Sequence, residues 1–244
     1  MLRIYDGQTV AEVTPGRARE LRLGVSAPSA NGPAGLADLR RFLVADLVRR
    51  TAQRHRLTVS MASDSRPPGL AALNIHLPEP RSPGGTTLHT PRAADGADVW
   101  VADTGPGVVP GPTTAGTPGL ADPLTAVADR GLDPLALRLA FLEHHYRDSL
   151  DLTWGELDRA DATLREWRHQ VAVWATQPSK PMCAQYVAEL TGAFDNDLET
   201  PAALASLRAL AADPEIPPGS KFETVAYIDQ LLGLDVVSEV GRAG

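Results

Sequence analysis

The chain has 244 residues, and 30 Asp and Glu against 23 Lys and Arg give it a formal net charge of −7. This acidic balance argues against a broad nucleic-acid-binding surface, and the lack of any run of about 18 apolar residues excludes a conventional membrane span. The single cysteine, Cys183, excludes a disulfide framework and a multi-thiolate metal site. The first residues lack the basic-then-apolar pattern of a signal peptide, so we expect a cytoplasmic protein without a membrane partner.

Charge and composition are unevenly distributed along the chain. Residues 1–110 carry 13 Lys and Arg against 10 Asp and Glu, whereas residues 111–244 carry 10 against 20. The acidic second part repels phosphate backbones, which disfavours tRNA as a partner there. Of the basic residues, 21 are arginines and only Lys180 and Lys221 are lysines. This bias, with abundant Ala, Gly and Pro, indicates a GC-rich genome, and we expect an actinobacterial source.

Residues 1–121 read as an α/β segment. Leu36, Leu39, Leu43 and Leu47 lie at helical spacing, so they predict an amphipathic helix over Leu36–Arg50. This helix lies between two short apolar runs, and the strand–helix–strand order favours a parallel pair with a right-handed crossover. The strands predicted for this part are, in order, 2–5, 9–13 (after a turn at Asp6–Gly7), Leu21–Val25, Leu57–Met61 and Asp98–Val101.

Two segments rich in Pro and Gly interrupt this pattern, at 64–96 and 103–123. Proline removes a ladder donor, so we expect irregular chain there, apart from a short helix at 69–74. From Asp122 onward the spacing becomes helical and predicts an antiparallel bundle. Its predicted helices cover 133–146, a segment capped by Thr153 with Glu156, a segment through Cys183 and Phe194, residues 200–212, and a segment from Ser220 to Gly233.

The fold class predicted from these patterns is α/β. A shortened Rossmann-type domain at about 1–121 precedes an all-α bundle at about 122–244. The stretch Arg22–Arg50 reads as strand, loop and helix, the arrangement that places a helix N-terminus where a phosphate would bind.

At this point the chain resembles the cysteinyl-tRNA synthetase family, which includes the cysteine ligase of mycothiol biosynthesis. Arg22–Arg50 aligns without a gap on the family's strand–CGPT–HIGH–helix segment. LTVSMASDS resembles the strand before its DIDD motif, and GLDPLALRLAFLEHHYRDSLDLTW resembles the helix after its KMSKS loop. AFDNDLETPAALASL and GSKFETVAYIDQLLGLD match the family's helical stem-contact region. The resemblance implies a class I synthetase fold and a nucleotide and amino-acid pocket beside Arg22–Arg50.

The residues that carry the family's chemistry depart from its pattern. Ser26 stands at the zinc-binding cysteine of CGPT, and the other zinc ligands lie in a segment that is deleted between about Arg92 and Trp100. Gly35 and Asp38 stand at the two histidines of HIGH. The KMSKS register falls on 113–117, and no lysine precedes residue 180. We therefore expect that zinc is lost and that ATP binding is weak or absent, with no catalytic residues and no metal ligands.

Several residues are singled out by this comparison and by charge. Arg40 and Arg41, with Arg49 and Arg50, belong to the main basic concentration, which we interpret as a solvated helix face, with RNA or an acidic partner as the alternative. The residues predicted to line the vestigial nucleotide and amino-acid pocket are Ser26, Pro28, Gly35, Asp38, Asp64 and Trp100.

Other chemistry-bearing residues receive structural interpretations. His144 and His145 are adjacent in a helix and do not share a face, so they are not expected to bind one metal. Cys183 falls on an apolar stripe and is expected to be a buried, unreactive thiol. Asp195 and Asp197 precede a helix and suit capping roles.

These observations predict a pseudoenzyme related to cysteine ligases, a binding or regulatory protein that does not adenylate cysteine. Its partner would be a full-length synthetase or an enzyme of the same pathway. Two alternatives stay open. One is a rewired ligase or aminoacyl-transfer enzyme that uses a preactivated donor, and the other is a tRNA-binding module.

Overall fold

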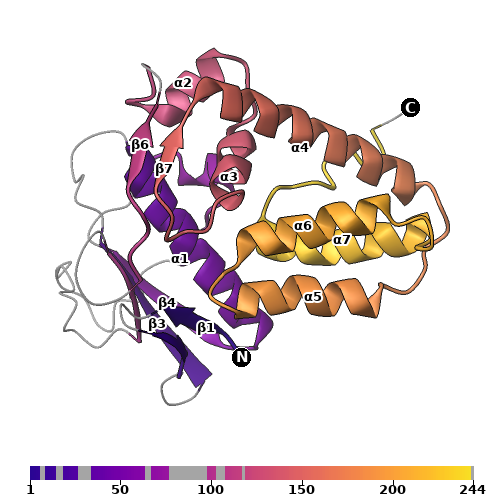
Figure 1. Ribbon diagram of the computed structural model, residues 1–244, viewed down its shortest axis with the longest axis horizontal. Helices are drawn as coiled ribbons and strands as arrows, with labels where there is room; N and C mark the ends of the chain where they lie inside the picture. Colours follow the sequence, from indigo (N-terminus) through magenta and orange to yellow (C-terminus); the bar gives the residue numbers. More distant parts are fainter. Residues whose placement is uncertain are drawn as a thin grey trace, which may run out of the picture.

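The computed structural model of the chain describes residues 1–5, 9–14, 19–26, 34–63, 67–76, 98–102, 108–116 and 119–242. Over these ranges the chain is an α/β protein in which seven α-helices accompany three small sheets (Figure 1). Among the helices of the described ranges, none combines the length and the apolar character that crossing a bilayer requires.

The N-terminal strands follow the sequence prediction. β1 (Arg3–Tyr5) pairs with β2 (Val10–Glu12) in antiparallel register, which confirms the predicted strand pair. The turn predicted at Asp6–Gly7 lies outside the described residues. β3 (Glu20–Val25) lies between two parallel neighbours, β4 (Thr58–Ser63) and β5 (Val99–Val101). The predicted parallel pairing of the strands on either side of the first helix is therefore confirmed.

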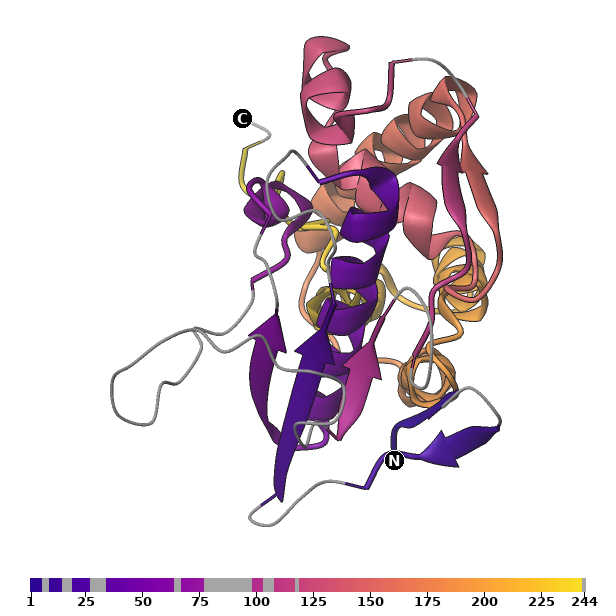
Figure 2. The same ribbon diagram turned by 90° about the vertical axis from the view of Figure 1, so that its left-hand side faces the viewer.

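Alternation along β3 gives this sheet two different faces. Leu21, Leu23 and Val25 are fully buried, because their side chains share the face that packs against the helix. Arg22 points to the other face, where its Nη2 lies 2.8 Å from Asp98 Oδ1. Figure 2 shows the sheet with α1 (Leu36–Arg54) lying along one face.

Helix α1 is enclosed on more than one side. It contacts all three strands of the sheet on one side, and it also contacts α7 and a second, smaller sheet. As a result, 14 of its 19 residues are buried, several of them charged. The helix continues past the predicted end at Arg50 and stops before Arg56, whose φ of 59° is left-handed.

The second small sheet was not predicted. β6 (Thr113–Ala115) pairs in parallel with β7 (Leu150–Leu152), so the expectation of irregular chain throughout 103–123 is wrong. Each strand has only three residues, and the partner is far away in the chain, so no local alternation marks either strand. The short helix predicted at 69–74 is present as a 3₁₀ turn, η2 (Leu70–Leu73).

The C-terminal half is helical, as predicted, but some boundaries differ. The helix predicted over 133–146 ends at Leu142, so Tyr146 lies beyond it. The last helix starts at Pro218 with Pro217 as N-cap, so Ser220 is inside the helix and does not cap it. The helices are α2 (Pro123–Asp129), α3 (Pro134–Leu142), α4 (Trp154–Ala175), α5 (Ala184–Asp195), α6 (Thr200–Ala212) and α7 (Pro218–Leu232).

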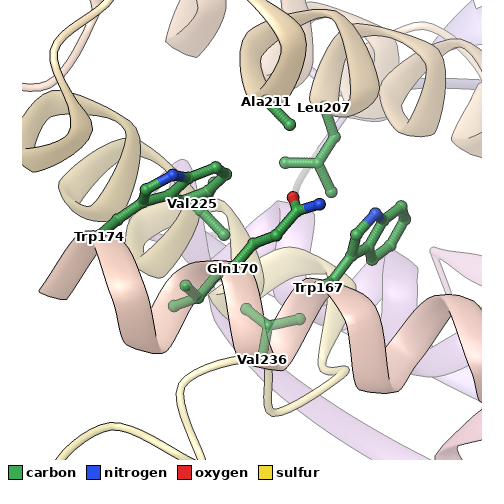
Figure 3. A pocket seen from close by; sticks show the side chains of 8 residues that line it. Trp167, Gln170, Trp174, Leu207, Ala211, Val225 and Val236 are labelled. Carbon is green, nitrogen blue, oxygen red and sulfur yellow. The ribbon is translucent and has the colours of Figure 1, made fainter.

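Helix α4 carries a seam of aromatic packing against α6 and α7. The capping box at its start is confirmed, because Thr153 N donates to Glu156 Oε2 at 2.8 Å and Glu156 N donates to Thr153 Oγ1. Further along, Trp167 and Trp174 flank Gln170 and face α6 and α7 (Figure 3). The space left between them is about 10 Å³, which holds no more than a water molecule, so this is packing and not a ligand site.

A buried ion network joins α1 to the helical half. The Asp46 carboxylate on α1 is fully buried, and its Oδ2 lies 2.9 Å from Nη2 of the equally buried Arg138 on α3. Arg49 Nη2 and Arg50 Nε donate to the same carboxylate at 2.5 and 2.7 Å. Arg138 also donates to the carbonyl oxygens of Leu73 and Leu232. One carboxylate therefore organises contacts among α1, η2, α3 and the end of α7.

The ionisation of this network follows from its surroundings. Burial alone would raise the pKa of Asp46, but Arg138, Arg50 and Arg49 outweigh that cost and lower the pKa below its usual value. Burial also lowers the pKa of Arg138 to about 10, with Asp46 opposing the shift. Because the pKa of Asp46 is lower in the folded than in the unfolded state, the ionised carboxylate stabilises the fold at pH above the unfolded pKa. This contribution is lost as the pH falls through the pKa of the folded state.

We predict that Asp46→Asn lowers the free energy of unfolding by about 3–5 kcal/mol, because it leaves the buried Arg138 without its counter-ion. Urea unfolding followed by circular dichroism measures this change. The free energy of unfolding of the variant should also fall less steeply with decreasing pH than that of the wild type, because the Asp46 carboxyl group is absent. Asp158→Asn, which breaks the exposed pair with Arg130, is the matched control and should leave the midpoint nearly unchanged. Equal effects of the two substitutions would contradict a central role for Asp46.

Candidate functional site

The start of α1 is the place where sequence reasoning puts a phosphate, and the structure shows an internal carboxylate there. Gly35 is the N-cap, with extended backbone, and has no side chain to cap the helix. Asp38 in the first turn reaches back, and its Oδ2 accepts the Gly35 amide hydrogen at a donor–acceptor distance of 3.3 Å. A carboxylate in the first turn complements the helix dipole. The position that attracts an anion is thus occupied by the chain's own anion.

Arg41 neutralises this carboxylate and ties it to the sheet. Its Nη2 donates to Asp38 Oδ1 at 2.8 Å, and its Nη1 donates to the carbonyl oxygen of Ser26 at 2.9 Å. Both members of the Asp38–Arg41 pair are buried. Ser26 directly follows β3, so the contact links the carboxyl end of the central strand to the first turns of α1. Because Arg41 and Asp38 are paired one to one, the pair offers a ligand little net positive charge.

A hollow of about 320 Å³ lies beside this pair. It opens near the carboxyl ends of β3 and β5, the usual ligand position in open parallel sheets. Arg41 is the one charged side chain among its described lining residues, and the other walls are small or apolar. Those walls are Ala37, Ala102 and the segment Val109–Thr113.

Arg40 fixes the far wall of the hollow. Its Nη1 donates to Asp148 O at 2.8 Å and to Thr113 Oγ1 at 3.1 Å, and its Nη2 donates to His145 O at 2.9 Å. A further bond reaches the carbonyl oxygen of Gly111. Burial lowers the pKa of Arg40 to about 10, while Asp148 opposes that shift. The guanidinium therefore holds the segments that lead into β6 and β7 against α1.

The predicted pocket residues are only partly brought together. Ser26, Gly35 and Asp38 meet at the start of α1, as described above. Trp100 lies in β5, where its backbone is in register with Gly24. Pro28 and Asp64 fall outside the described residues.

The interpretation of the basic concentration as a solvated helix face is wrong. Arg40 and Arg41 are buried and donate inside the protein. Arg49 and Arg50 are mostly covered and share the carboxylate of Asp46. The physical reason is that α1 contacts the sheet on one side and β6 and α7 on others, so few of its positions reach solvent.

Asp195 and Asp197 do not cap a helix. Asp195 ends α5 and pairs with Arg54 Nη2 at 2.5 Å and His55 Nε2 at 2.7 Å. Asp197 is buried, and its Oδ1 accepts from Tyr5 N and Tyr146 Oη at 2.8 and 2.6 Å. Burial is the main cause that raises the pKa of Tyr146, with Asp197 adding to it.

The interpretations of the histidines and the cysteine are also revised. His145 lies in the turn after α3 and not in the helix. Its Nε2 is 3.0 Å from the carbonyl oxygen of Asp197, so its role is structural, as expected. Cys183 is the N-cap of α5 and is partly exposed, so the expectation of a buried thiol is wrong.

The residues do not fit a zinc ion of the kind the resemblance implies. Ser26 offers a hydroxyl where a thiolate is needed. Cys183, the one cysteine of the chain, is at the start of α5, where its amide donates to Thr224 Oγ1. Across the residues that the structure describes, no group of three or more His, Cys, Asp or Glu is placed to hold a metal.

The known proteins that this chain resembles are ligases that act on cysteine. No protein-family model matches the sequence. A ligase of Thermomonospora curvata that joins L-cysteine to 1D-myo-inositol 2-amino-2-deoxy-α-D-glucopyranoside is 38% identical over 109 residues, 43% of this chain and 25% of its own length. The corresponding ligase of Streptomyces coelicolor is 42% identical over 108 residues, again 43% of this chain and 25% of its own. Cysteine–tRNA ligase 1 of Burkholderia lata is 36% identical over 111 residues, 46% of this chain and 23% of its own. The chain thus spans about a quarter of the length of these curated relatives.

We predict that Arg40→Met lowers the free energy of unfolding by about 3 kcal/mol, because several buried carbonyl groups lose their donor. Thermal and urea unfolding measure the loss. Arg159→Met, at an exposed position on α4, removes the same charge and should be close to neutral. A loss below about 1 kcal/mol for Arg40→Met would show that these bonds do not hold β6 and β7 on α1.

Asp38→Ala should destabilise the protein by about 1–2 kcal/mol, because it removes the acceptor of the Gly35 amide and the counter-ion of Arg41. Asp38→Asn keeps an acceptor and should restore part of that loss. Equilibrium unfolding of the three proteins at the same pH tests this order. If Asp38→Ala were as stable as the wild type, the carboxylate would not hold the helix start.

Proposed function

We propose that this chain is a non-catalytic relative of the cysteinyl-tRNA synthetase family, a binding or regulatory protein that does not adenylate cysteine. One observation carries the proposal: the start of α1 is filled by the Asp38 carboxylate, which holds Arg41 in an ion pair. The relatives named above are ligases of cysteine. Relatedness to a ligase family does not require activity, because activity resides in the site and not in the fold.

The chemistry explains why this arrangement opposes adenylation. Transfer of a nucleotidyl group develops negative charge on the α-phosphoryl oxygens, and cations and hydrogen-bond donors must stabilise it. Gly35 and Asp38 replace the two histidines of the family pattern, and no lysine precedes Lys180. Loss of one such donor raises a barrier by about 2.7–4 kcal/mol. Loss of several, allowing for non-additivity, gives a deficit on the order of 10 kcal/mol, roughly 10⁷ in rate.

The proposal includes the fold relationship. We interpret β3, α1, β4 and β5 as the remnant of a shortened Rossmann-type domain at 1–121, since the strands are parallel and α1 crosses between β3 and β4. We interpret α2–α7 as a helical bundle at 122–244 that resembles the stem-contact region of the family. In this proposal zinc and ATP are not cofactors, and the protein acts in the cytoplasm.

A protein partner is favoured over tRNA. Residues 111–244 carry 20 Asp and Glu against 10 Lys and Arg, which repels a phosphate backbone. Arg40 and Arg41 are used for internal bonds and are not presented to RNA. We propose a full-length synthetase, or an enzyme of the same pathway, as the partner.

A second candidate function rests on the hollow beside Arg41. Its volume of about 320 Å³ is within the range of small-ligand sites, so the position still has room for a substrate. An aminoacyl-transfer enzyme that receives a preactivated donor would need no adenylation residues. Turnover of cysteinyl adenylate that disappears in Ala37→Phe, which fills the hollow, would favour this candidate.

We predict no cysteine-dependent exchange of pyrophosphate into ATP above the protein-free background, with magnesium and zinc supplied. The expected deficit of roughly 10⁷ places any residual rate below detection. A cysteine–tRNA ligase assayed in the same buffer is the positive control. Exchange that requires cysteine, and that Ala37→Phe abolishes, would overturn the non-catalytic assignment.

A further inference from the structure

A second hollow lies at the other end of α1, between α1 and α7. Its volume is about 360 Å³, which is also within the range of small-ligand sites. Helix α1 contributes three arginines to its wall, and α7 contributes an aromatic ring and an amide. None of the described lining residues is acidic. The lining residues are Arg49, Arg50, Gln53, Arg54, Tyr227, Gln230 and Leu231.

Positive charge exceeds negative charge around this hollow. Arg49 and Arg50 share the single carboxylate of Asp46 with Arg138. Arg54 shares Asp195 with the amino group of Met1, 3.7 Å from Asp195 Oδ2, and with His55. Four guanidinium groups thus face two carboxylates. Partly buried charges are normally paired, so this excess calls for a further anion.

The remaining acidic group nearby does not remove the excess. Asp229 lies close enough to Arg138 for each group to shift the pKa of the other. The Asp229 carboxyl, however, already accepts the amide hydrogens of Leu234 and Val236. Burial is the main cause that raises the pKa of Asp229. Even when Asp229 is counted as ionised, four guanidinium groups face three carboxylates.

The arginines are held in place before any ligand arrives. Arg50 donates to Asn74 O and Gln230 O at 2.7 and 2.8 Å, and Arg49 Nη1 donates to Gln53 Oε1 at 2.8 Å. Fixed side chains lose less conformational entropy on binding. In addition, Nε of Arg49 and Nε of Arg54 are buried and have no acceptor among the described residues. The described acceptors around this cluster therefore do not use all of its donors.

The carbonyl groups at the end of α1 do not compete strongly with an anion. The amides of Arg56 and Leu57 donate to the carbonyl oxygens of Gln53 and Ala52, and Arg19 Nη2 donates to His55 O. These bonds satisfy carbonyl groups at the negative end of the helix, which would otherwise be without a donor.

We propose that this hollow between α1 and α7 binds a phosphate group. Phosphate matches the guanidinium fork and the multiple positive charge better than a single carboxylate does. The Tyr227 ring and Leu231 offer an apolar surface to whatever carries the phosphate. The group belongs either to a small phosphorylated molecule or to an RNA backbone. Arg54 is 16 residues from Asp38, about 24 Å along the helix, so the site is independent of the proposed function.

Gln53→Glu is the decisive variant. Gln53 lines the hollow and is exposed, and its Oε1 already accepts from Arg49, so glutamate keeps this bond and adds one negative charge. Calorimetric titration at fixed ionic strength should show saturable binding of inorganic pyrophosphate to the wild type. We expect Gln53→Glu to bind pyrophosphate about tenfold more weakly than the wild type does. Arg54→Gln should weaken binding in the same direction.

The control variants distinguish binding at this hollow from a general effect of the protein's net charge. Arg159→Gln removes one exposed positive charge on α4 and should leave the affinity within about twofold. Circular dichroism and thermal unfolding of Gln53→Glu verify that its fold is unchanged. If Arg54→Gln does not fold, the comparison of Gln53→Glu with Arg159→Gln still decides the question.

A short RNA duplex, titrated in parallel, distinguishes the two sources of phosphate. Binding of pyrophosphate alone supports a small phosphorylated ligand, and binding of the duplex that Gln53→Glu weakens supports an RNA backbone. If neither probe binds saturably, or if Gln53→Glu and Arg159→Gln behave alike, the proposed phosphate site is wrong.

Discussion

The interaction on which the rest of the structure depends is the fully buried contact between Asp46 and Arg138. Helix α1 fills the space between the parallel sheet, the β6–β7 pair and α7, so charged side chains on it cannot all reach water. Each must find a partner inside the protein, because an unpaired buried charge is costly. Asp46 collects guanidinium groups from α1 and α3, and through Arg138 it reaches η2 and the end of α7. The helical half is therefore attached to the sheet by charge as well as by apolar contact.

Helix α1 now presents different electrostatic conditions at its two ends. At its start, Asp38 and Arg41 neutralise each other and occupy the place where an α/β protein commonly receives a phosphate. Toward its end, guanidinium groups outnumber carboxylates around the hollow shared with α7. One helix of this chain thus carries a neutralised pair at its start and an excess of positive charge toward its end. Scaffold and site change separately, which is why similarity over less than half of the chain does not settle activity.

Local patterns allowed much of the fold to be predicted from sequence. The short apolar run Leu21–Val25, helical spacing from Leu36, and the Thr153 and Glu156 pair each describe a structure that neighbouring residues decide. The β6–β7 pair could not be predicted in this way, because three-residue strands far apart in the chain carry no periodic signal.

The candidate site was predictable only in part. Asp38 was identified at the start of the helix, but its ion pair with Arg41 depends on burial that only the packed structure shows. Arg40 was placed on a solvated face because spacing reveals one apolar stripe and not a helix enclosed on several sides. One signal was available and was missed. Asp46 interrupts the apolar run FLVADLV, with Arg49 and Arg50 at helical spacing, a pattern that indicates a paired buried acid.

The bonds of Asp197 have a consequence for how the chain folds. Its side chain accepts the amide hydrogen of Tyr5 across 192 positions of sequence, and its own amide donates to Arg3 O. The backbone there is left-handed at Asp197 and again at Leu198, a conformation that such residues hold only when surrounding contacts impose it. Closing so long a loop costs conformational entropy, so we expect these contacts to form after the local helical ones. We therefore expect α5 and α6 to assemble before β1 docks, and the turn between them to reach its final geometry only with that docking.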